Sequence, residues 1–338
     1  MKINKGITLI ALIITIIVML ILVSVSISIA IKTGLFEQAG NATKKYRGEQ
    51  EKESNLSKIT VGGVEYDSVE DYIAKNNGAS QNAAKWVYVD NGDETIEITG
   101  IDLRGKKSEK KTQLTNGNSY DTITLKLQND TLIIPDEIEG KRVISVSLTE
   151  NLYDGMIEAD YDTWLIINGV KNLIYSDNIE QIKNQAIAFK EVENLHLPSE
   201  LKDISNTEMN SCPLGHFESL QSVIIPSKVE NIGYGAFFGC SNLKNVRFAG
   251  APKTIGQDVF IYTGIDELTF PEGVEEIGRT YDLGNETITL PKSLKKFDGI
   301  GMGSRNATIS FPNGINENLT IPEDKWGASK VIVEGVEQ

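Results

Sequence analysis

Residues 222–243 read SVIIPSKVENIGYGAFFGCSNL, and this stretch decides the fold because its pattern recurs along the chain. Val223 and Ile225 lie three and one positions before a proline, and this period of two predicts a short strand with one face directed inward. The proline then ends the strand, because it has no N–H to donate to a ladder. A second apolar pair, Val229 and Ile232, follows the proline and predicts the opposite wall of the same coil.

Equivalent patterns recur through most of the remaining chain. A large apolar residue (Leu, Ile or Phe) is followed by proline seven times, at Ile134-Pro135, Leu197-Pro198, Ile225-Pro226, Phe270-Pro271, Leu290-Pro291, Phe311-Pro312 and Ile321-Pro322. With Phe248-Ala249 counted as a copy without its proline, the interior copies recur every 20 to 28 residues. One coil cannot bury both of its walls, but coils stacked at about 4.8 Å would form parallel sheets around a continuous core. The sequence therefore predicts a mainly β solenoid of stacked parallel coils over residues 85–322.

Two stretches carry the family resemblance. Residues 232–243 combine a Gly-rich turn with an Ala-Phe-x-x-Cys motif, and residues 131–143 read TLIIPDEIEGKRV. The Gly-rich stretch resembles the bacterial surface leucine-rich repeats of the BspA type, and residues 131–143 are similar to the usual opening of such an array. Repeats after Val274 lack the Ala-Phe-x-x-Cys turn, so shorter coils are expected there. The resemblance implies a leucine-rich repeat fold, and known members of the family act in adhesion and protein binding.

Side chains two and four positions before each proline should point outward, because their neighbours point inward. This row is the candidate binding face: Ser222, Ile224, Asn245, Arg247, Glu267, Thr269, Thr287, Thr289 and Ser310, continued by Asn194, His196 and Thr308. Stacking of the coils places equivalent positions in one ladder. The expected ligand of this row is an extracellular protein or glycan. Arg247 is the most informative residue, because a guanidinium in a mostly neutral row would favour an acidic ligand. The alternative is that an exposed strand simply prefers polar residues such as threonine.

The amino-terminal part predicts a membrane segment. Residues 7–31 contain no charged side chain. A helix of this length would reach ~37 Å, enough to cross a hydrocarbon core of ~30 Å. Lys2 and Lys5 precede the segment and mark the cytoplasmic side, so we expect a single-pass bacterial surface protein with its C-terminus outside. A secretory signal cut after Ala30 and a plain uncleaved anchor are the alternatives.

Residues 5–11, with the sequence KGITLIA, resemble the prepilin cleavage motif of type IV pilins and pseudopilins. The resemblance implies that a prepilin peptidase cuts after Gly6 and that Ile7 becomes the methylated first residue. It also implies that other pilin subunits are partners, and that the protein is held in the membrane or in a pilus. Ala11 departs from the family, which often has a glutamate there to neutralise the amino terminus of a neighbouring subunit. Cleavage is therefore expected to be less affected than packing into a filament, where a buried unpaired ammonium is costly.

Changes in composition suggest how the chain is organised. The expected parts are a leader (1–6), a transmembrane and stalk helix (7–55), a small connector and linker (56–84), the repeat array (85–322) and a C-terminal cap or tail (323–338). The connector should contain a strand at residues 58–61 and a helix that begins after Ser68 as its N-cap. Within the array, the polar residues 104–121 are expected to loop out. Residues 90–93 are expected to form a tight turn rather than a calcium loop.

Composition also limits the function. A formal net charge of −14 repels phosphate backbones, so nucleic-acid binding is not expected. Cys212 and Cys240 are too few for a disulfide framework and are expected to be reduced and buried. His196 and His216 lack the clustered partners of a metal or nucleophile site, so no metal, cofactor or catalytic residue is predicted and an enzyme is not expected. Two alternatives stay open: a structural minor pilin with the repeats as a spacer, and a membrane-anchored surface enzyme or sensor.

Overall fold

The structure is a computed structural model that describes residues 58–61, 64–75, 85–107, 110–113, 119–154, 163–205, 212–280, 287–301 and 307–338. The predicted membrane segment and the predicted cleavage site at Gly6 and Ile7 lie outside these residues. The chain separates into two compact units, residues 1–54 and 55–338, and all described residues belong to the second unit. Within the described ranges, no helix is long and apolar enough to cross a membrane.

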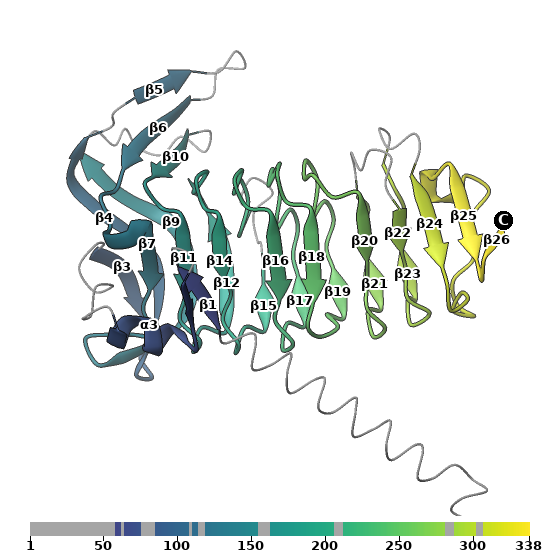
Figure 1. Ribbon diagram of the computed structural model, residues 1–338, viewed down its shortest axis with the longest axis horizontal. Coiled ribbons are helices and arrows are strands. Elements are labelled where there is room, and N and C mark those ends of the chain that lie inside the picture. The colour runs from purple at the N-terminus through teal and green to yellow at the C-terminus, as the bar shows by residue number, and fades with distance from the viewer. Residues whose placement is uncertain are drawn as a thin grey trace, which may run out of the picture. The chain divides into compact units, whose positions relative to one another are not determined.

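One set of short strands lies along one side of the stacked coils (Figure 1), and we call its outward surface the first face. Its strands form three hydrogen-bonded groups: β7 (Thr131–Ile134), β11 (Asn172–Tyr175) and β14 (Asn194–His196); β16 (Ser222–Ile225) and β18 (Asn245–Phe248); and β20 (Glu267–Thr269), β22 (Thr287–Thr289), β24 (Thr308–Phe311), β25 (Lys330–Val333) and β26 (Val336–Glu337). All of these pairs are parallel except β25 with β26.

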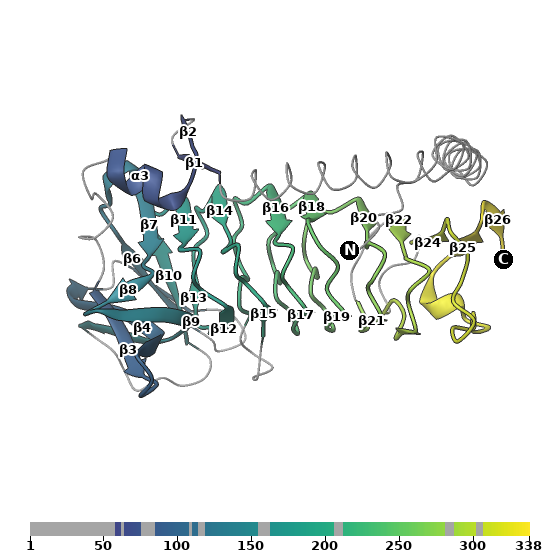
Figure 2. The same ribbon diagram turned by 90° about the horizontal axis from the view of Figure 1, so that it is seen from below.

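A further set of strands lies on the opposite side of the coils (Figure 2), and we call its outward surface the second face. The hydrogen-bonded order is β23 (Lys296–Phe297), β21 (Glu276–Ile277), β19 (Thr254–Ile255), β17 (Asn231–Ile232), β15 (Asp203–Ile204), β12 (Gln181–Gln185), β9 (Lys141–Asp154), β4 (Thr95–Lys107) and β3 (Lys85–Asp90), with β8 (Glu137–Ile138) paired to β9. Pairing is parallel from β23 to β4, so the second face is one continuous sheet over the described strands.

The core fills the space between the two sheets. Val223 and Ile225 of the first wall are buried, as are Val229 and Ile232 of the second, and the equivalent positions of other coils join the same cluster. Full burial of an aliphatic side chain contributes about 1.5–3 kcal/mol, and stacking adds one such layer with each coil. The predicted solenoid with two apolar walls in each coil is therefore confirmed.

The turn between β3 and β4 explains the Asp-Asn-Gly-Asp sequence. Gly92 has a φ of 86°, and its N–H donates to Asp90 Oδ1 at 2.9 Å. Asp93 Oδ1 accepts from the hydroxyl of Thr95 at the start of β4. These residues form the predicted tight turn.

The expectation that residues 104–121 loop out is wrong. β4 continues to Lys107, and β5 (Lys110–Gln113) and β6 (Ser119–Thr124) form a hairpin. β6 pairs in parallel with β10 (Thr163–Asn168), which also pairs with β13 (Ile187–Ala188). A polar sequence at the edge of the array is thus held by backbone pairing with a strand much further along the chain. The short 3₁₀ turn η1 (Gln128–Asp130) then leads into β7.

The strand and the helix predicted for the connector are both present, and a second strand lies between them. β1 (Ile59–Val61) and β2 (Val64–Tyr66) form a hairpin, and α3 (Val69–Lys75) follows it. Ser68 caps this helix, because its hydroxyl accepts the N–H of Asp71 at 3.1 Å. Figure 2 shows the connector lying over the first face at β7, β11 and β14.

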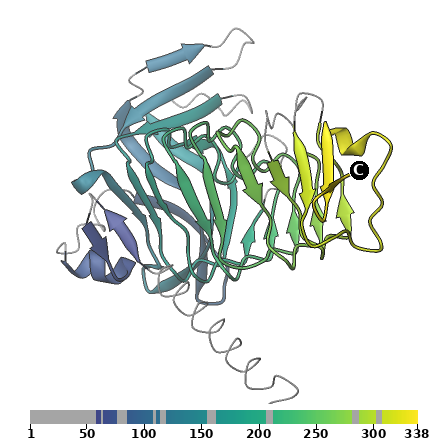
Figure 3. The same cartoon turned by 45° about the vertical axis from the view of Figure 1, so that its right-hand side comes forward.

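The C-terminal residues close the open end of the core. The 3₁₀ turn η2 (Lys325–Gly327) places Trp326 against Phe297 and Phe311, with ring centroids 5.6 and 5.9 Å away. Trp326 is buried, and its carbonyl accepts the N–H of Ile300 at 2.6 Å. β25 then adds a further parallel strand to β24, and β26 folds back on it (Figure 3). Residues 323–338 therefore cover the last coil, as terminal units of a repeat array must.

Candidate functional site

The predicted binding-face residues lie on the first face in two ladders. Ser222, Asn245, Arg247, Glu267 and Thr269 are exposed, and Ile224, Thr287, Thr289 and Ser310 are half-buried. On β16 and β18, Ile224 stands opposite Arg247. On β20, β22 and β24, Thr269, Thr289 and Ser310 follow one another in register. No ladder joins β18 to β20 in the described residues, so the structure brings the row together in two segments.

The connector covers the beginning of the first face. Ile133 and Ile174 occupy the same outward row on β7 and β11, and both are buried. Ile59 and Tyr72 of the connector pack against them in a small apolar cluster of their own. The side chain of His196, the next position in the row, is only 10% exposed. The open part of the first face therefore begins at Ile224 and not at His196.

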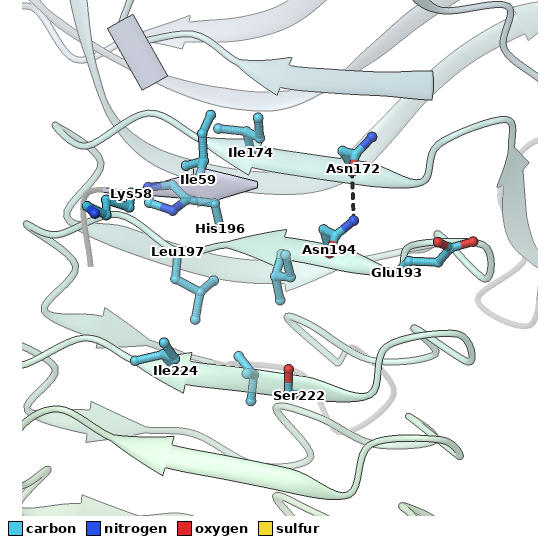
Figure 4. Close-up of a pocket in the computed structure, with 12 residues that line it drawn as sticks. Lys58, Ile59, Asn172, Ile174, Glu193, Asn194, His196, Leu197, Ser222 and Ile224 are labelled. Atoms are coloured by element: carbon cyan, nitrogen blue, oxygen red, sulfur yellow. Dashed lines mark hydrogen bonds between the residues drawn. The ribbon is translucent and has the colours of Figure 1, made fainter. Parts of the chain in front are cut away.

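A pocket of about 180 Å³ lies where β14 and β16 separate, beside the edge of the connector (Figure 4). We call it the junction pocket. Its lining mixes aliphatic groups, such as Ile59 and Ile224, with polar groups, such as Asn194 and Ser222. Asn194 is fixed by a hydrogen bond from its amide to Asn172 Oδ1 at 2.8 Å, drawn in Figure 4. A volume below the usual ~300 Å³ of a small-molecule site suits one side chain or one sugar unit of a larger ligand.

His196 lines this pocket and faces the half-buried carboxylate of Asp177. Its Nε2 lies 3.7 Å from Asp177 Oδ1, too far for a hydrogen bond, and has no other partner within the described residues. Burial alone would raise the pKa of Asp177. The His196 ring and the backbone N–H of Ser199, 2.9 Å away, outweigh that effect and hold the pKa of Asp177 below its usual value. Asp177 is therefore ionised at neutral pH beside the imidazole.

A groove of about 400 Å³, not predicted from the sequence, lies on the second face. It crosses β15, β17, β19, β21 and β23, and its polar wall is the row Asp203, Asn231, Thr254, Glu276 and Lys296. Gly233, Gly256 and Gly278 lie along it. A Cβ on Gly256 would come within 2.7 Å of the Gly233 carbonyl carbon, so the glycine is needed for close stacking of the coils. The sequence did contain a signal for this groove. In each coil, the polar wall residue directly precedes the inward residue that ends the second apolar pair.

Three aromatic rings form another feature that the sequence analysis missed. His216, Phe238 and Tyr262 lie in the turns that follow second-face strands, and we call them the turn ladder. The ring centroids of His216 and Phe238 are 5.3 Å apart, as are those of Phe238 and Tyr262. Both contacts are edge-to-face, the arrangement that aromatic quadrupoles favour.

The two cysteines lie in the same turns. Cys212 and Cys240 are buried and unbonded, and Cys240 Sγ donates to the carbonyl of Leu214 at 3.3 Å. Burial raises the pKa of each thiol to about 12, so both stay protonated at neutral pH. The expectation of reduced, buried thiols is confirmed. No group of three or more His, Cys, Asp or Glu side chains suited to a metal is found among the described residues.

A match to a known family covers the central coils. The family described as the BspA type leucine rich repeat region matches residues 167–288 in six copies. The chain contains a BspA-type leucine-rich repeat domain. Residues 167–288 include the junction pocket's strands β14 and β16, the exposed residues of β18 and β20, and the turn ladder. The domain is thus consistent with a protein-binding surface, and the resemblance to the BspA-type repeats is confirmed.

Two solved structures are similar to the chain. A leucine-rich repeat protein from Bacteroides ovatus is 14% identical, with 75% of each chain covered and a TM-score of 0.29. A leucine-rich repeat protein from T. pallidum is 17% identical over 66% of this chain and 82% of its own, with a TM-score of 0.30. No curated protein matches the chain.

Proposed function

We propose that the chain is a bacterial cell-surface protein whose leucine-rich repeat domain binds an extracellular protein or glycan through the first face. The observation that carries the proposal is the exposed polar row from Ser222 to Thr269, which lies directly beside the junction pocket. A flat row of short side chains next to one small pocket can hold an extended partner and anchor one of its groups. Binding rather than catalysis is the role that this arrangement favours.

The proposed ligand is acidic at the point where it meets β18. Arg247 is exposed and presents the guanidinium of the row, and Ile224, which stands opposite it on β16, is uncharged. Arginine binds carboxylates and sulfates through two parallel hydrogen bonds, so its removal should weaken an acidic ligand more than a neutral one.

Arg247→Ala is expected to lower affinity for an acidic ligand roughly tenfold, and Thr269→Ala to lower it less. The full chain in detergent micelles is first applied to an array of immobilised glycans and extracellular proteins, and affinities for the hits are then measured by interferometry. Lys296→Ala removes an exposed cation from the second face and is the matched control. Unchanged affinity in both first-face variants would exclude this row as the binding surface.

We further propose that a pilin-like amino-terminal segment displays the domain, held in the membrane or built into a pilus with other pilin subunits. The proposal rests on the sequence from Lys5 to Ala11 and on the uncharged residues 7–31. A prepilin peptidase would be the processing partner. Ala11 stands where family members often have the glutamate used in filament packing. Retention in the membrane therefore needs less explanation than incorporation into a pilus.

The cleavage proposal predicts a mature protein that begins at Ile7 with a methylated amino group. Mass analysis of the amino terminus of protein recovered from its native cell surface checks this directly. Replacing Gly6 with a bulky residue should leave the leader attached, while Lys2→Ala, further from the cut, should leave processing intact. A mature chain that begins at Met1 or after Ala30 would contradict the proposal.

A further inference from the structure

The turn ladder lies in the matching turns of three successive coils: His216 and Tyr262 occupy equivalent positions, and Phe238 lies one residue before the equivalent Gly239. The N–H of His216 donates to the carbonyl of Phe238 at 2.7 Å, and the N–H of Gly239 donates to the carbonyl of Ile261 at 3.0 Å. The register is the same in both steps, so His216, Gly239 and Tyr262 are structurally equivalent. All three have left-handed backbones, with φ of 59°, 72° and 56°.

The fold needs only a left-handed residue at this position, and glycine is the residue that adopts it without strain. The middle coil has glycine, and the His216 ring lies over it: a Cβ on Gly239 would meet His216 Nδ1 at 2.8 Å. The outer two coils instead carry a histidine and a tyrosine. Histidine adopts this conformation more readily than most residues, whereas a bulky tyrosine in it is an outlier that costs stability.

The three rings of the turn ladder reach solvent to different extents. Tyr262 is 52% exposed, among the most exposed large apolar side chains of the described residues. Phe238 and His216 are half-buried beside it. Burial, and then the nearby Lys190, hold the pKa of His216 below its usual value, so this ring is uncharged at neutral pH. The ladder is therefore a strip of three neutral rings.

The residues that border the turn ladder are polar rather than apolar. Ser241 and Asn242 follow the middle turn and are exposed, and the amide of Asn242 donates to the carbonyl of Glu218 at 2.6 Å. Glu218 also forms an ion pair with Lys190 at 2.7 Å. A protein-binding hot spot usually lies in a well-packed, fully desolvated pocket near the centre of an interface, whereas Tyr262 is half exposed. A strip one ring wide, edged by hydroxyl, amide and charged groups, fits a linear ligand that offers both C–H faces and hydroxyls.

We propose that the turn ladder formed by His216, Phe238 and Tyr262 is an additional binding site, separate from the first face, for a neutral linear polysaccharide. Rings spaced 5.3 Å apart along the array allow neighbouring sugar units to contact neighbouring rings. The net charge of −14 disfavours acidic polysaccharides and nucleic acids, which leaves an uncharged chain as the best match.

The test uses affinity electrophoresis of the full chain in detergent through native gels that contain hydroxyethyl cellulose, galactomannan or arabinoxylan, with hyaluronan as the anionic comparison. At least one neutral polymer should retard the wild-type chain, and hyaluronan should not. Tyr262→Gly should weaken that retardation roughly tenfold, the effect expected when one stacking ring is lost. Because Gly239 shows that glycine suits this position, the melting temperature of Tyr262→Gly should stay unchanged or rise.

Two controls separate the ladder from other effects. Glu94 also has a left-handed backbone, with a φ of 63°, on the distant turn before β4, so Glu94→Gly relieves similar strain and should leave retardation unchanged. Arg247→Ala should also leave it unchanged. Absence of retardation by all three neutral polymers overturns the proposal, as does full retardation of Tyr262→Gly. Loss of retardation in Arg247→Ala but not in Tyr262→Gly would assign the glycan to the first face. Binding of a protein, and of no polysaccharide, to the turn ladder would also refute a polysaccharide site.

Discussion

Phe237→Ala is expected to destabilise the central coils by about 3–5 kcal/mol, the usual cost of removing a buried phenylalanine ring. Phe237 is fully buried and stacks on Phe260 of the next coil, with ring centroids 5.6 Å apart and an interplanar angle of 11°. Its N–H also donates to the carbonyl of Val259 at 2.8 Å. The substitution leaves that backbone bond in place and opens a cavity between two coils, so the loss reports packing alone.

Chemical denaturation followed by circular dichroism measures this change, and hydrogen exchange locates it. In a solenoid each coil contacts only its neighbours, so exchange should accelerate first in β17, β18 and β19. Phe237→Leu keeps most of the volume and is the matched control, with an expected cost of roughly 1 kcal/mol. An unchanged denaturation midpoint in Phe237→Ala would show that the ring does not bridge the two coils.

The repeat pattern predicted the strands and walls of the coils because both follow from local alternation and from proline. Val223 and Ile225 face inward because side chains alternate along a strand. Pro226 ends the strand because it has no N–H to donate. Pairing between distant segments has no such local signal. The hairpin of β5 and β6 was therefore missed, since its polar residues gave no indication that β6 would pair with β10.

The covered start of the first face could have been read from the sequence. Ile133 and Ile174 stand at outward positions where later coils have histidine, arginine or threonine, with Ile224 as the exception. Two isoleucines in successive coils at this outward position predict a covering element, and the connector supplies it with Ile59 and Tyr72. The turn ladder had a weaker signal. It is seen only when Tyr262 is aligned with Gly239, and that alignment depends on backbone hydrogen bonds.

Trp326→Ala is expected to open the C-terminal end of the array, with a local cost of about 3–5 kcal/mol. Trp326 fills the end of the core between Phe297 and Phe311, and its backbone has a left-handed φ of 56°. This conformation costs a non-glycine residue about 1–2 kcal/mol, so burial of the indole must outweigh that strain. Removal of the indole leaves the strain and exposes the last apolar layer.

Hydrogen exchange of the full chain distinguishes a local cap from a general core residue. Exchange should accelerate at Ile300, whose N–H donates to the Trp326 carbonyl, and along β22 and β24, while β11 and β12 at the far end keep their protection. Trp326→Phe retains an aromatic ring and should show a smaller change at the same amides. Equal acceleration in β11 and β24 would mean that the coils unfold as one unit and that Trp326 is not a local cap. Terminal coils otherwise expose their core to water. A local response would therefore also explain why residues 323–338 break the repeat pattern: β25 adds one last parallel strand, and Trp326 and β26 then close the end of the stack.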